Sequence, residues 1–75
     1  MENTTIQYPG ISAKVDQYIK DYCEDCGLTF TDARFDIPTK TRTIEWEGTF
    51  TLGEELELID TLHEEGIEIT ILTEE

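Results

Sequence analysis

The most strongly signalled element of this 75-residue chain is a helix between Thr51 and Gly66. Thr51 followed three residues later by Glu54 is a capping box, in which hydroxyl and carboxylate each bond a free amide of the first turn. Gly66 suits the left-handed conformation that ends many helices. Apolar residues recur between them at steps of three and four, which predicts one stripe facing a core. That stripe comprises Leu52, Leu56, Ile59 and Leu62 or His63, with Leu58 lying off it.

A second helix is predicted from about residue 11 to residue 25. Pro9-Gly10 breaks the chain before it, Ser12 is a suitable N-cap, and Gly27 is a suitable stop. The apolar spacing again predicts an inward stripe, made of Ile11, Val15, Tyr18, Ile19, Tyr22 and Cys26.

The remaining segments alternate as strands do. Residues 4–8 place Ile6 and Tyr8 on one face, and residues 67–72 alternate isoleucines with other residues. Residues 28–37 also alternate as a strand, but the apolar residues change from even to odd positions partway along. A β-bulge near Asp32, which inserts one residue, would bring them all to the same face. A hairpin at Thr39-Lys40 then leads into another strand-like segment, residues 41–50. Its alternation predicts three inward side chains: Ile44, Trp46 and Phe50. Gly48 interrupts that inward set and leaves room for a helix to approach.

The element order β-α-β-β-α-β predicts an α+β, ferredoxin-like two-layer sandwich, with an antiparallel sheet and two helices on one face. If residues 4–8 are not a strand, a three-stranded α-β-β-α-β sandwich remains. A chain this short forms one domain over residues 1–75, near the size at which a single core is marginal. Many functions share this architecture, so the fold assigns none.

Charge is the strongest functional signal. The net charge of −13 divides into about −2 up to Arg42 and −11 beyond it, where eleven Asp/Glu are accompanied by no Lys or Arg. Glu64 and Glu65 fall in the last helical turn, where the helix dipole disfavours carboxylates. A strongly negative chain repels nucleic acids and anionic membranes, so we expect it to bind neither directly. Basic protein surfaces and cations are the partners that it attracts.

Cys23 and Cys26 form a C-x-x-C, the pattern found in redox and metal sites. They fall at a helix C-terminus with two carboxylates between them, which disfavours the thiolate that redox chemistry needs. With His63 they make three zinc ligands at most, so they are weak metal candidates. We expect a partly buried thiol pair, no cofactor and an electrostatic role for His63. No nucleophile with a partnered base and no phosphate-binding glycine loop is present, so we expect no enzymatic activity.

No apolar run approaches eighteen residues, and no basic start precedes an apolar segment. This pattern predicts neither a membrane span nor a signal peptide, and a cytoplasmic location is expected.

These observations lead to a functional hypothesis. The chain is expected to be a non-enzymatic inhibitor whose carboxylates mimic nucleic-acid phosphates and block a basic DNA- or RNA-binding groove. It is similar in size and charge to small acidic bacteriophage proteins that block restriction or CRISPR systems, which would place it in the host cytoplasm. One alternative is an acidic interaction or regulatory domain, antitoxin-like, that binds a basic partner without mimicry; a dimer is compatible with either. Another is an acidic face that is only solvated and serves solubility in high salt, without a specific partner. The expected partner-binding residues are Glu45, Glu47, Glu54, Glu55, Glu57, Asp60, Glu64, Glu65, Glu68, Glu74 and Glu75.

Overall fold

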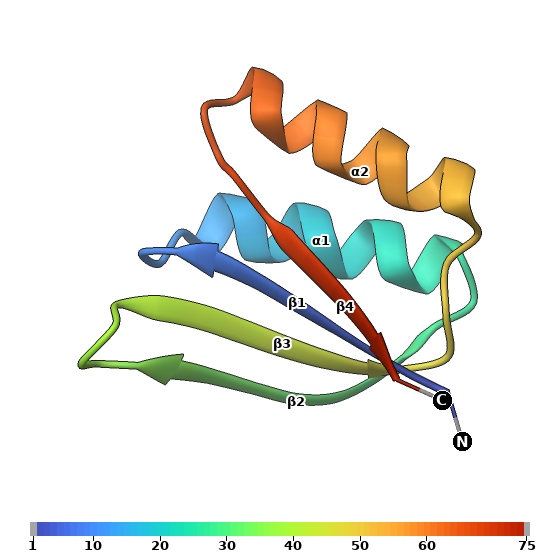
Figure 1. Ribbon diagram of the computed structural model, residues 1–75, viewed down its shortest axis with the longest axis horizontal. Coiled ribbons are helices and arrows are strands. Elements are labelled where there is room, and N and C mark those ends of the chain that lie inside the picture. Colours follow the sequence, from blue (N-terminus) through green and yellow to red (C-terminus); the bar gives the residue numbers. More distant parts are fainter. Residues whose placement is uncertain (1, 75) are drawn as a thin grey trace.

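The computed structural model describes residues 2–74 and has two layers (Figure 1). Its elements are β1 (Asn3–Pro9), α1 (Ala13–Asp25), β2 (Thr29–Asp36), β3 (Thr41–Glu47), α2 (Leu52–Glu64) and β4 (Thr70–Glu74). The strands lie in the order β2-β3-β1-β4, each pair of neighbours is antiparallel, and both helices cover one face. The predicted ferredoxin-like α+β sandwich is therefore confirmed.

β1 is a central strand of the sheet. It pairs with β3 on one side and with β4 on the other, so that Ile6 lies between Ile44 and Ile71. The sequence pattern did not decide whether residues 4–8 form a strand. They do, so the three-stranded alternative is wrong. Burial follows the predicted alternation, since Ile6 and Tyr8 are both buried on the helix side of the sheet.

Local capping fixes the ends of both helices. The Ser12 hydroxyl accepts from the Val15 amide at 3.3 Å at the start of α1. Thr51 and Glu54 form the predicted capping box at the start of α2, with amide-to-side-chain distances of 2.8 and 3.2 Å. Gly27 follows α1 with φ +84°, a left-handed conformation that favours glycine. The predicted caps and stops are confirmed.

The β-bulge predicted in the second strand is also present. Phe30 lies opposite Trp46 and Asp32 lies opposite Glu45, so Thr31 is the inserted residue. The Thr31 hydroxyl donates to the Glu45 carbonyl at 2.9 Å. The insertion keeps Phe30 on the helix side, where its ring meets Trp46 edge to face with centroids 5.5 Å apart.

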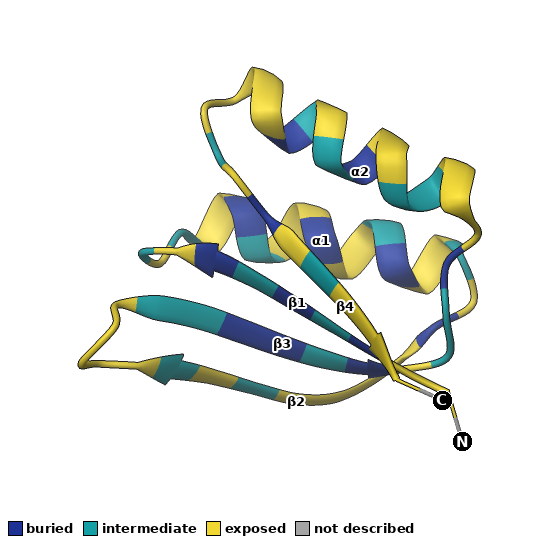
Figure 2. Ribbon diagram, viewed as in Figure 1, coloured by how far each residue is buried: buried dark blue, intermediate teal, exposed yellow. Residues whose placement is uncertain are grey.

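The core lies between the sheet and the two helices (Figure 2). Its fully buried side chains include Ile6, Ile19, Cys23, Trp46 and Leu58. The inward assignment of β3 and the segment after it is confirmed, because Ile44, Trp46 and Phe50 are all buried.

The orientation predicted for α2 is only partly correct, because Leu62 is buried and Ile59 packs against the core but Leu52 and Leu56 do not. Leu58, placed off the apolar stripe, is fully buried with Leu62, whereas Leu52 and Leu56 are 71% and 52% exposed. The helix carries two apolar stripes, and periodicity does not choose between them. Contacts from both sides decide: Tyr22 of α1 donates to the Glu54 carbonyl, and Thr73 of β4 donates to the Glu55 carboxylate. Leu58 and Leu62 lie between these two flanks and face the core.

Smaller differences concern the ends of other elements. Ile11 precedes the cap of α1 and is 64% exposed, and Cys23 takes the inward position instead. β4 begins only at Thr70, so Ile67 and Ile69 lie in the segment leading to it. Gly48 is approached by the Leu28 side chain and not by a helix, since a Cβ there would lie 3.4 Å from Leu28 Cγ. Within residues 2–74, neither helix has the length and apolar character needed to cross a bilayer.

Candidate binding surface on the helix layer

The most exposed carboxylates of α2 form one row along its solvent side. Glu57, Asp60 and Glu64 are exposed and follow one another at steps of three and four residues. At a rise of about 1.5 Å per residue, this row extends for roughly 10 Å along the helix. Glu65, the C-cap, is exposed just beyond this row, on the side of α2 that faces Lys14 of α1. We call Glu57, Asp60, Glu64 and Glu65 the helix-layer row.

Two predicted site residues at the start of α2 have structural partners instead. The Glu54 carboxylate accepts from the Thr51 amide at 2.8 Å, and this bond lowers the pKa of Glu54. The Glu55 carboxylate accepts from the Thr73 hydroxyl at 3.4 Å. Both residues are half-buried. They hold α2 in place, and they are less available to a partner than the helix-layer row.

Other predicted site residues lie on the opposite side of the molecule. Glu45, Glu47 and Glu74, here called the sheet-face acids, alternate with inward residues and point away from the helices. Glu45 forms an ion pair with Arg34, and this contact raises the pKa of Arg34. Glu68 is exposed in the segment before β4, and Glu75 lies outside the described residues. The predicted acids therefore do not form one surface.

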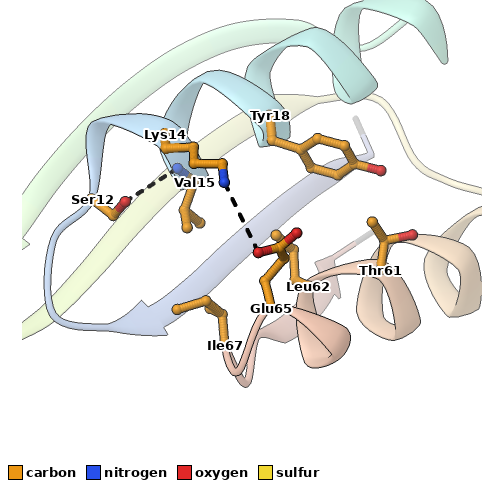
Figure 3. A pocket seen from close by; sticks show the side chains of 8 residues that line it. All are labelled: Ser12, Lys14, Val15, Tyr18, Thr61, Leu62, Glu65 and Ile67. Carbon is orange, nitrogen blue, oxygen red and sulfur yellow. Dashed lines mark hydrogen bonds and ion pairs between the residues drawn. The ribbon is translucent and has the colours of Figure 1, made fainter.

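A groove lies between the N-terminal half of α1 and the C-terminal end of α2, which sequence reasoning missed. It encloses about 240 Å³, and Figure 3 shows the side chains that line it. Its deepest lining residues are Val15 and Leu62, which are buried, and half-buried Ile67 completes this apolar base. The sequence signal was present in part, because Tyr18 and Tyr22 lie one turn apart beside the buried stripe of α1. The partner of Tyr22 on α2, Glu54, lies 32 residues away in the sequence.

Polar side chains form the rim of this groove. Lys14 extends toward Glu65, and the two charged groups lie 4.0 Å apart across it (Figure 3). Both side chains are largely exposed, at 86% and 61%. Tyr18 extends from α1 on the side of Thr61, whose hydroxyl donates to the Glu57 carbonyl at 2.8 Å. The groove therefore adjoins the helix-layer row.

A smaller cavity of about 180 Å³ lies on the other side of α1, bordered by Asp16, Lys20, Phe30 and Trp46. Asp16, at the edge of this cavity, links α1 to the sheet through two contacts. Its carboxylate lies 3.1 Å from the Arg42 guanidinium and accepts from the Tyr8 hydroxyl. Burial, followed by the bond to Asp16, raises the pKa of Tyr8 to about 12.

The two cysteines are free thiols. Burial raises the pKa of the Cys23 thiol to about 12, and burial with a bond to Glu54 raises that of Cys26 to about 11. Both groups are therefore neutral near pH 7, and burial is the main cause, ahead of the two intervening carboxylates that we expected to be responsible. Among residues 2–74, no three His, Cys, Asp or Glu side chains are grouped for metal binding. His63 is exposed in the last turn of α2.

No family model and no curated protein matches the chain. Its structure is similar to the crystal structure of a formyltetrahydrofolate deformylase from Pseudomonas putida KT2440, with a TM-score of 0.62 and 14% sequence identity. The match covers 99% of this chain and 28% of that one. The chain thus spans less than a third of the length of the deformylase, and at this identity the likeness is one of fold alone.

Proposed function

We propose that this chain is a non-enzymatic inhibitor whose helix-layer row occupies a basic, nucleic-acid-binding groove on a protein partner. The observation that carries the proposal is the exposure of Glu57, Asp60 and Glu64 along α2 and of Glu65 at its C-cap. Within the described part of the chain, Lys14 is the one cation within ion-pair distance of this row. α1 adds the exposed carboxylates of Asp21 and Asp25 to the same layer.

The charge density of α2 supports this reading in part. The thirteen residues of α2 span about 20 Å at a rise of about 1.5 Å each. Its five carboxylates and that of Glu65 amount to roughly one charge per 3.3 Å, close to the ~3.4 Å per phosphate along one DNA strand. Glu54 and Glu55 have partners within the protein, which leaves the four acids of the helix-layer row at a lower density. Two of these four have weaker contacts: the Glu57 carboxylate accepts from the Tyr22 hydroxyl at 3.5 Å, and Glu65 lies 4.0 Å from Lys14. The sheet-face acids point the other way and would not enter the same groove.

A second candidate is an acidic interaction or regulatory domain, antitoxin-like in kind, that binds a basic partner without mimicking nucleic acid. The observation that favours it is apolar surface beside the acids. Leu52 and Leu56 are exposed on α2, and the inter-helix groove has an apolar base. Phosphate backbones offer no counterpart to such surface. The free thiols fit a cytoplasmic setting for either candidate, that of a host cell if the chain is phage-encoded.

Competition with nucleic acid tests the proposal. The partner is first captured from host lysate with nuclease-treated and untreated samples, and is then titrated with the chain in the presence of its own DNA or RNA. The proposal expects mutual exclusion and binding that weakens steeply with added salt. A ternary complex of chain, partner and nucleic acid would favour the second candidate and contradict mimicry.

A matched pair of charge reversals locates the surface. Asp60→Lys with Glu64→Lys alters the helix-layer row, whereas Glu47→Lys with Glu74→Lys makes the same change of charge on the opposite face. The helix-layer variant should lose binding and the sheet-face variant should keep it. Equal losses would show that only the overall negative charge matters.

A further inference from the structure

The inter-helix groove is suited to an apolar group of limited size. Its volume of about 240 Å³ lies below the roughly 300–1,000 Å³ of typical small-molecule sites. Val15 and Leu62 form its buried base, and neither side chain offers a hydrogen bond. The Thr61 hydroxyl at its edge already donates to the Glu57 carbonyl. A single large apolar side chain would bury its surface against this base without leaving a polar group of the base unpaired.

The charges at the rim of the groove indicate which residues of a partner would lie next to that apolar side chain. Glu65 lies at the rim, and the other acids of the helix-layer row follow along α2. Lys14 is the opposing cation, but its contact with Glu65 is long, at 4.0 Å, and both side chains are mostly exposed. Exposed pairs of this kind contribute little to stability, so another cation can replace Lys14 at low cost. Charge complementarity therefore favours a basic occupant.

We propose that this groove receives one aromatic or branched aliphatic side chain of the basic protein partner, while a neighbouring Lys or Arg of that partner pairs with Glu65. The inference rests on the proposed function, because it takes the acidic helix layer to be the binding surface. The inference adds to the proposed function a way for the chain to bind one basic partner specifically. Buried apolar anchors surrounded by a polar rim supply most of the affinity in protein interfaces, whereas rim charges mainly set association rate and orientation.

Two short peptides serve as probes. One has a Phe within a Gly-Phe-Gly centre flanked by Lys and Arg, and the other carries Ala in place of Phe. Titration into the isotopically labelled protein, followed by NMR, gives both affinities and the amides that shift. The Phe peptide should bind at least tenfold more tightly, because burying an aromatic ring in an apolar site is favourable. The largest shifts should fall at Val15, Thr61, Leu62 and Ile67.

Variants locate the effect. Thr61→Phe places a ring inside the groove and should reduce the ratio of the two affinities to near one. Thr39→Phe, the matched control, adds the same ring in the exposed hairpin and should leave the ratio unchanged. Tyr18→Ala removes one wall of the groove and should also lower the ratio. Tyr18 is 36% exposed, so this change spares the core.

The outcomes separate the inference from the proposed function. Equal, salt-sensitive binding of both peptides would leave the acidic surface standing and overturn the anchor groove. A Phe preference that survives Thr61→Phe would place the anchor elsewhere and overturn it too. Failure of both peptides to bind would overturn the anchor groove, whereas the competition experiment with nucleic acid decides the proposed function separately. If sedimentation shows a dimer that Thr61→Phe dissociates, the occupant is a second copy of this chain and the inference is wrong.

Discussion

Replacing Leu58 by Ala tests the observed orientation of α2 most directly. Leu58 is fully buried, and truncating such a leucine removes its transfer free energy and leaves a cavity, at a cost of about 3 kcal/mol. A domain of this length has roughly 4–11 kcal/mol of stability in total. The change should therefore remove a large part of the free energy of unfolding. Leu52→Ala is the matched control, because its side chain is 71% exposed and its loss should cost less than about 0.5 kcal/mol.

Urea unfolding followed by the fluorescence of Trp46, which is fully buried, measures both variants. With a slope of about 1 kcal/mol per molar urea, Leu58→Ala should lower the midpoint by about 3 M and Leu52→Ala by less than 0.5 M. The slopes should agree, since both variants expose the same surface on unfolding. Equal losses, or a larger loss for Leu52→Ala, would refute the orientation and favour the stripe that periodicity predicts.

Three further predictions concern charge and ionisation. The melting temperature should rise between low and moderate salt, because screening relieves repulsion in a chain of charge −13; a flat curve would contradict this. Both thiols should react slowly with a thiol-specific reagent at pH 8 in the folded protein and rapidly once it is unfolded; fast reaction of the folded protein would contradict their neutrality. Burial raises the pKa of Cys23 from 9.0 to about 12, so the stability contributed by its neutral form is complete below pH 9 and declines as the pH rises toward 12. Melting temperatures measured from pH 7 to pH 11 should fall less for Cys23→Ala than for the parent; parallel curves would assign the decline to other groups.

Features set by neighbouring residues were predictable from sequence. The capping box needs only Thr51 and Glu54, which are three residues apart, and the helix stop needs only Gly27. The bulge was visible because the apolar phase changes within one strand, and its insertion at Thr31 lies one residue from the predicted position. In each case the interaction that determines the structure lies within a few residues of the signal.

Features set by distant residues were not predictable in the same way. α2 has two apolar stripes, and the choice between them depends on contacts with Tyr22 and Thr73, which lie in other elements. The apolar groove requires α1 and α2 to come together near Val15 and Leu62. The division of the acids between two faces likewise depends on the placement of the sheet. Charge along the sequence showed how many acids there are, but only the fold shows which of them share a surface.

The helix-layer row leads to a final prediction, in which stability and binding change in opposite directions. Asp60 and Glu64 lie one turn apart with like charges, and Glu64 lies in the last turn of α2, where a carboxylate is disfavoured by roughly 0.3–1 kcal/mol. Glu64→Lys reverses the dipole interaction and pairs residue 64 with Asp60. Together these effects should stabilise the fold by about 1 kcal/mol and raise the melting temperature by about 4–8 °C. The same variant should weaken partner binding.

Thermal melts and partner titration on the same preparation measure both effects. Glu47→Lys, which adds the same charge on the sheet face, is the control for binding. A variant that melts higher and still binds at full strength would show that Glu64 belongs to a solvated face. A lower melting temperature would mean that a favourable contact of Glu64 outweighs its repulsion from Asp60. Loss of binding with gain of stability is the outcome expected if these acids are retained for a partner, because the fold alone would be better served by lysine at this position.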